Sequence, residues 1–125
     1  MRIEAHRAKA QTIERSLARL SAADYETVIE ACMLAGTHWL NILLHRTGMS
    51  APECDTTHAE FMPGGERRKA AVVIPDAIRA LDTIEALRTT HVRGNLGGGP
   101  DAAHRALDCL AVLREQALAG DPPAR

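Results

Sequence analysis

The fold is decided by residues 22–46, which read AADYETVIEACMLAGTHWLNILLHR. Two adjacent apolar stripes recur here at helical spacing; the first comprises Val28, Cys32, Ala35, Trp39 and Leu43, and the second Ile29, Met33, Gly36 and Leu40. This spacing predicts a helix, and apolar residues around so much of its girth predict that other helices surround it. We therefore expect the central helix of an all-α domain, with Gly36 allowing a neighbouring backbone to approach closely.

Three further segments have helical periodicity. Their inner stripes are Ile3, His6, Ala10, Ile13, Leu17 and Leu20 in residues 3–20; Ile78, Leu81 and Ile84, continued by Arg88 and His91, in residues 66–92; and Ala103, Leu107, Leu110, Leu113 and Ala117 in residues 101–119. Pro75 disfavours helix at the preceding residue and predicts a break near residues 74–75. Ser21 and Asp24 predict a capping box before the central helix. We expect one domain, residues 1–125, folded as an antiparallel four-helix bundle with room for a short fifth helix near residues 55–61.

The amino-acid composition restricts which classes of molecule the protein can bind. The formal net charge is −1, from 15 basic and 16 acidic residues, so no domain-wide positive field favours DNA, and any RNA contact has to be local. Cys32, Cys54 and Cys109 form no CxxC pair and predict free thiols in a reducing compartment. The N-terminal residues lack a signal-peptide core, and no apolar run reaches the length of a membrane span. We expect a cytoplasmic protein without membrane contact.

His38, Asn41 and His45 share one face of the central helix, because they lie at positions i, i+3 and i+7. They are candidate binding residues of a polar site between helices. A polar stripe that is only partly exposed explains the same pattern, and both interpretations stay open.

Arg88 and His91 form a second candidate pair, because they continue an apolar stripe toward the core or an interface. A buried arginine needs an anionic partner, which predicts either a salt bridge to Glu30, Asp55 or Glu85 or a clamp on a phosphate. His91 would be the nearest proton-transfer group in such a site. The structural salt bridge is the interpretation we favour.

Residues 54–60 offer ligand types for a metal, since His58 follows Cys54 and Asp55, and His38 and His45 could join it. The Glu-x-x-His pairs of di-iron bundles do not occur, so we predict no metal and no cofactor. Residues 94–100, GNLGGGP, follow a helix and are followed by no Gly-Lys-Ser/Thr, which favours a flexible turn over a phosphate loop.

The chain resembles the HEPN superfamily of small helical bundles over roughly residues 12–118. The similarity rests on three strings: the Ala-rich stretch from Ala31 to His45, the Thr57-His58 pair followed by Phe61, and residues 87–94, LRTTHVRG. Catalytic HEPN proteins carry an arginine, four to six residues and then a histidine, and act as metal-independent ribonucleases across a dimer interface. Here two residues separate Arg88 from His91, and ten separate Arg93 from His104.

The resemblance therefore implies a bundle that forms a homodimer through its arginine-bearing face, with a nucleotidyltransferase-type partner, RNA or a nucleotide as further partners. We predict a binding or interaction module without catalytic activity, in which Arg93 joins the binding residues. The alternative is a metal-independent ribonuclease or nucleotide-binding protein of toxin–antitoxin type that uses Arg88 and His91. A second alternative is a metal-binding bundle that uses His38, His45 and His58.

Overall fold

The computed structural model describes residues 1–59 and 62–120, and every regular element in that part of the chain is helical. The elements are α1 (Ile3–Leu17), the 3-10 turn η1 (Ala22–Asp24), α2 (Tyr25–Arg46), α3 (Gly64–Val73), α4 (Pro75–Arg88), the π-helical turn η3 (Thr89–Arg93) and α5 (Gly99–Ala119). The predicted all-α bundle is confirmed. Phe61 and Glu60, and with them part of the turn expected near residues 55–61, lie outside the described residues; the short additional helix is α3.

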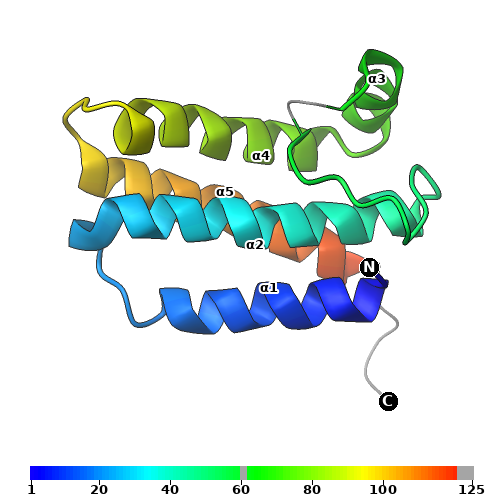
Figure 1. Cartoon of the computed structure of the whole chain (residues 1–125), viewed down its shortest axis with the longest axis horizontal. Helices are drawn as coiled ribbons and strands as arrows, with labels where there is room; N and C mark the ends of the chain where they lie inside the picture. Colours follow the sequence, from blue (N-terminus) through cyan, green and yellow to red (C-terminus); the bar gives the residue numbers. More distant parts are fainter. Residues whose placement is uncertain (60–61, 121–125) are drawn as a thin grey trace.

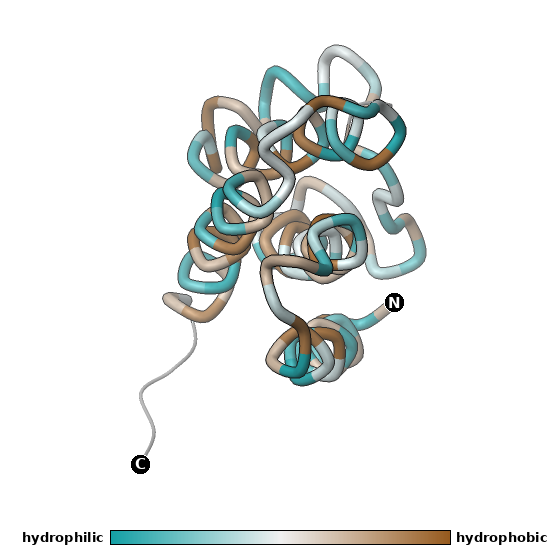
Figure 2. The backbone as a smooth tube through the Cα atoms, turned by 90° about the vertical axis from the view of Figure 1, so that its left-hand side faces the viewer, coloured by the Kyte–Doolittle hydropathy of each residue, from teal (hydrophilic) through white to brown (hydrophobic). Residues whose placement is uncertain are grey.

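Helix α2 is the centre of the bundle, as its sequence predicted. It packs against α1, α4 and α5, and the four long helices run in alternating directions (Figure 1). The view along the helices shows α2 between α1 on one side and the α4–α5 pair on the other (Figure 2). Both predicted stripes are buried, and Ile29, Cys32 and Trp39 are fully inaccessible.

Gly36 permits close packing at this centre, although through side chains rather than the neighbouring backbone that we expected. A Cβ atom at Gly36 would lie 3.0 Å from a methyl carbon of Leu113 and 3.1 Å from one of Leu81. Leucines of α4 and α5 therefore fill the space that the missing side chain leaves on α2.

The ends of the helices follow local sequence signals. The amide of Ser21 donates to the carboxylate of Asp24, and the Ser21 hydroxyl accepts from the amide of Ala23, so the predicted capping box is formed. Ile74 leaves the helical region (φ −132°, ψ 59°) and Pro75 begins α4, which confirms the predicted break. Helix α1 ends at Leu17, earlier than predicted, because the amides of Arg19 and Leu20 bond to carbonyls only three residues back, in tighter turns.

One predicted core position in α5 is wrong. Leu107 is 37% exposed, whereas Ala106 is fully buried. The buried positions of the helix advance by alternating steps of three and four residues from Ala103, and this places Ala106 on the inner face and Leu107 beside it.

Contrary to the expectation that no apolar run reaches the length of a membrane span, the segment Ala22–Arg46 is long and apolar enough to cross a membrane by length and composition, and it is the one such helix in the described residues. Of its most apolar window, 72% is buried inside the fold. Burial of this extent is consistent with the core helix of a soluble protein.

Candidate functional site

A groove of about 540 Å³ runs along the exposed face of α2. It is lined by His6 of α1, by residues of α2 between Thr27 and Asn41, by residues 55–58 of the loop after α2, and by Arg88 at the end of α4. The groove thus gathers four of the residues singled out in the sequence, namely His38, Asn41, His58 and Arg88. Leu34 also lines it and is 55% exposed, so the middle of the groove is apolar and open to solvent.

At one end of the groove, carboxylates hold Arg88. Its Nε donates to Glu30 Oε1 at 2.7 Å, and its Nη1 lies 3.4 Å from Glu85 Oε1. The hydrogen bond to Glu30 raises the pKa of the Arg88 guanidinium, so the arginine stays charged. Arg93 also approaches Glu85, at 3.9 Å. Two of the three carboxylates proposed from the sequence are thus the partners of Arg88, while Asp55 pairs elsewhere.

His91 is separated from this groove. It lies in the π-helical turn and is 9% exposed, and its Nδ1 lies 3.3 Å from the carbonyl oxygen of Leu96. Since a carbonyl only accepts, this contact assigns the proton of the ring to Nδ1. The lining of the groove includes Arg88 but neither His91 nor Arg93.

The opposite end of the groove carries a cluster of histidines around Asp55. His6 Nε2 and His45 Nε2 each lie 2.9 Å from the same carboxylate oxygen, Asp55 Oδ1. The amino group of Met1 lies 3.1 Å from both oxygens of this carboxylate and also contacts the carbonyl of Pro52. The side chains of His6 and His45 are 2% and 1% exposed, and that of Asp55 is 29% exposed.

The outer nitrogens of both imidazoles have partners too. His6 Nδ1 lies 2.9 Å from His38 Nδ1. His45 Nδ1 lies 2.9 Å from the hydroxyl of Ser50 and 3.2 Å from its carbonyl oxygen. Both rings are therefore fixed in orientation by contacts on their two nitrogens.

The electrostatics of the cluster favour an ionised carboxylate at Asp55 and a neutral imidazole at His38. Burial alone would raise the pKa of Asp55, but hydrogen bonds from His6, His45 and the N-terminal amino group lower it to about 2. Burial lowers the pKa of His38, and the neighbouring His6 lowers it further.

Asn41 fastens the loop that carries Asp55. Its side-chain nitrogen donates to the carbonyl oxygens of Thr37 and Thr56, and its oxygen accepts from the amide of Thr56 at 2.8 Å. The residue is 1% exposed, and these contacts satisfy its amide in the core. Asn41 therefore positions the residue next to Asp55 rather than presenting a polar group to solvent.

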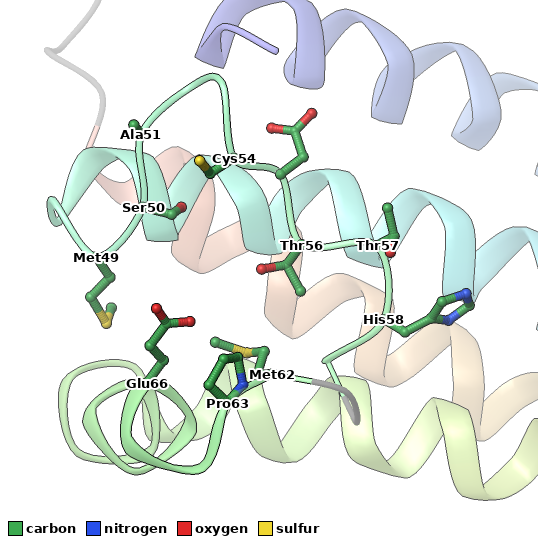
Figure 3. A pocket seen from close by; sticks show the side chains of 11 residues that line it. Met49, Ser50, Ala51, Cys54, Thr56, Thr57, His58, Met62, Pro63 and Glu66 are labelled. Carbon is green, nitrogen blue, oxygen red and sulfur yellow. The ribbon is translucent and has the colours of Figure 1, made fainter.

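A second cavity, of about 480 Å³, lies under the same loop (Figure 3). Met49, Met62 and Glu66 face one another across it, while His58 extends away from them along α2. His58 thus belongs to the groove side of the loop, where it lines the same surface as His38.

The metal-ligand atoms that come together differ from the expected set. Among the described residues, one group of His, Cys, Asp and Glu atoms lies close enough to hold an ion, within 4.8 Å of one another: His6, His45 and Asp55. His45 and Asp55 were among the expected ligand types, but His6 takes the place of His38 and His58. His6 could have been found from the sequence, because it lies within the apolar stripe of the first helix and a buried imidazole needs polar partners.

Comparisons with protein-family models, with curated proteins and with solved structures found no match for this chain. The resemblance to HEPN proteins stays a prediction that rests on the strings of residues quoted above.

Proposed function

We propose that the chain is a HEPN-like interaction module without catalytic activity, which pairs with a second copy of itself through the face that carries the groove. The observation that supports this most is the exposure of Leu34 in the middle of the groove. An apolar centre flanked by the charged Arg88–Glu30 pair is typical of an interface, where a polar rim surrounds a buried apolar core.

The groove suits a two-fold arrangement. In a closed dimer the same patch faces itself, so Leu34 of each copy can enter the groove of the other beside Ala31 and Met33. Arg88 lies on this face, which is the face that the resemblance assigns to the dimer. A nucleotidyltransferase-type protein, RNA or a nucleotide would be a further partner of the dimer, and the free thiols of Cys32, Cys54 and Cys109 favour a cytoplasmic location.

The surroundings of Arg88 and His91 argue against a ribonuclease. A phosphate bound by Arg88 would have to compete with the carboxylates of Glu30 and Glu85, which contact its Nε and Nη1 and place negative charge beside it. A general acid or base must reach the same substrate, and His91 does not line the groove that Arg88 lines. We therefore expect no hydrolysis of RNA by the purified protein.

Sedimentation equilibrium of the full chain at tens of micromolar tests the proposal. We expect the parent to be a dimer and Leu34→Glu to be a monomer, because two carboxylates would meet at the centre of the interface. Val72→Glu is the matched control, since Val72 is 81% exposed on α3 and lies outside the groove. A monomeric parent, or a Leu34→Glu variant that still forms dimers, would refute the proposal.

A further inference from the structure

We propose that His6, His45 and Asp55 bind one divalent transition-metal ion at the end of the groove. Two imidazole nitrogens and one carboxylate oxygen are donors that zinc and other first-row metals accept in proteins. The three residues come from α1, from α2 and from the loop that follows α2, so a bound ion would join three separate parts of the chain. This inference goes beyond the interaction module and does not depend on the dimer.

Two of the three separations between the donor atoms are close to those around such an ion. Each imidazole Nε2 lies 2.9 Å from Asp55 Oδ1, and all three donor atoms lie within 4.8 Å of one another. Around tetrahedral zinc, with bonds of about 2.0–2.1 Å, donor atoms stand roughly 3.3 Å apart. The two nitrogen–oxygen separations therefore need to widen by only a few tenths of an ångström for an ion to lie between them.

The outer contacts of His45 also favour a cation at its Nε2. The Ser50 carbonyl can only accept, so its 3.2 Å contact with Nδ1 favours a proton on that nitrogen, and the Ser50 hydroxyl at 2.9 Å can accept from it as well. In the tautomer with its proton on Nδ1, Nε2 carries a lone pair directed toward Asp55, and this is the form of the ring that can ligate a metal ion. Metal-bound histidines usually donate their second nitrogen in this way, to a backbone carbonyl or a similar acceptor.

Without a metal, the same atoms form a hydrogen-bonded cluster. If both Nε2 atoms carry protons, they donate to Asp55 Oδ1, while the amino group of Met1 can donate to Oδ2 and the Ser50 hydroxyl to His45 Nδ1. A bound ion would take the place of the two Nε2 protons. With a metal bound, His6 Nδ1 can donate to His38 Nδ1 and His45 Nδ1 to Ser50, so each outer nitrogen keeps its contact.

The burial of the cluster suggests how an ion reaches it. The imidazoles of His6 and His45 are almost wholly enclosed, whereas the carboxylate of Asp55 is 29% exposed. An ion can therefore enter along the carboxylate and meet two rings that are already held in place. Three protein donors leave at least one coordination position for water or another ligand, as in zinc sites that are not purely structural.

The test is titration of the metal-stripped, untagged full chain with zinc chloride in an isothermal calorimeter, against a chelator of known affinity. We expect one zinc ion per chain with a dissociation constant below about 1 μM. Asp55→Asn keeps the shape of the side chain but weakens its donor, and His45→Ala removes a ligand. Each should lower the affinity by more than the roughly 10–100-fold that loss of an outer hydrogen-bond partner costs. Ser50→Ala should fall within that smaller range.

Two matched histidine variants separate this site from other sources of binding. His104→Ala removes an exposed histidine of α5, and His58→Ala removes the groove histidine that the sequence suggested as a ligand. Both should bind zinc like the parent. Cobalt titration gives an independent readout, because the visible absorption of bound Co²⁺ should be lost in Asp55→Asn while circular dichroism shows an unchanged helical fold.

Several outcomes would overturn the inference. They are no zinc binding by the parent, equal zinc affinity in the parent and in folded Asp55→Asn, and loss of binding in His58→Ala with binding retained in Asp55→Asn. The last result would instead assign the ion to the histidines predicted from the sequence. Dimerisation is measured separately, so a failed zinc titration leaves the interaction module untouched, and a monomeric parent leaves the metal site untouched.

Discussion

The two ends of the groove handle polar groups in opposite ways. At the Arg88 end, a cation faces the carboxylates of Glu30 and Glu85, and donors meet acceptors within the chain itself. At the Asp55 end, farther along α2, three atoms that can act as metal ligands lie within 4.8 Å of one another. The first arrangement is a set of ion pairs, whereas the second has the donor atoms of the metal site that we propose. Ionisable residues in a groove are therefore better judged by the types of atom that meet than by their number.

The largest effect that we expect comes from breaking the ion pairs at the Arg88 end. Arg88→Ala leaves Glu85, which is 12% exposed, without its close cationic partner, and should lower the free energy of unfolding by about 3 kcal/mol. Arg79→Ala is the control, because the Arg79–Asp76 pair is exposed and should contribute at most about 0.5 kcal/mol. Urea denaturation measures both. Equal stability of the two variants would mean that the Arg88 end is not a structural ion pair.

A smaller effect should follow from releasing the loop at the other end. Asn41→Ala removes three hydrogen bonds and leaves the amide and carbonyl of Thr56 without their partner, which should cost about 2 kcal/mol in urea denaturation. The same variant should bind zinc more weakly than the parent, because Asp55 is no longer positioned. Ser16→Ala serves as the control, since its exposed hydroxyl bonds to the carbonyl of Thr12 within α1. Full zinc affinity in Asn41→Ala would show that the loop needs no such fastening.

The smallest expected effect is a difference in the rates at which two thiols react, one in the loop after α2 and one on the buried side of α2. Cys54, next to Asp55, is exposed, whereas Cys32 is fully buried on the core side. Burial, with smaller contributions from Glu14 and Cys109, raises the pKa of Cys32 to about 12. At pH 8 we therefore expect a disulfide reagent to modify Cys54 quickly and Cys32 only after unfolding, because the thiolate is the reactive form. Mass spectrometry of the labelled chain, with Cys54→Ser as the control, distinguishes them; rapid labelling of Cys32 in the folded protein would contradict the packing of α2.

The sequence predicts the bundle well because helical periodicity is a local property. The stripes of α2 and the break before Pro75 both depend on residues within a few positions of each other, and both are confirmed. The one wrong core position, Leu107, follows from a choice between neighbours, since Ala106 fits the same period and is small. Leu107 was assigned to the core because its side chain is large and apolar, but its angular position around the helix decides whether a residue is buried.

The candidate site was less predictable because its residues are distant in sequence. His6 and Asp55 are 49 positions apart, and Asp55 lies in a connection without any period. Asn41 could be recognised as a candidate because it is a polar residue on a largely apolar helix. Its partner Thr56 could not, because it lies in the same connection as Asp55. Periodicity indicates which residues face inward and leaves open which of them meet.

The π-helical turn after Arg88 changes the directions in which successive side chains point from the helix. In an α-helix, three residues turn through about 300°, which brings the fourth almost back over the first. Residues 89–93 are wound more loosely, with the amide of Gly94 bonded to the carbonyl of Thr89, so each residue advances through a smaller angle. This change in winding accompanies the different directions of Arg88, which faces the groove, and His91, which is buried. A motif defined by the number of residues between Arg88 and His91 assumes a constant angle per residue, and here that angle changes between the two residues.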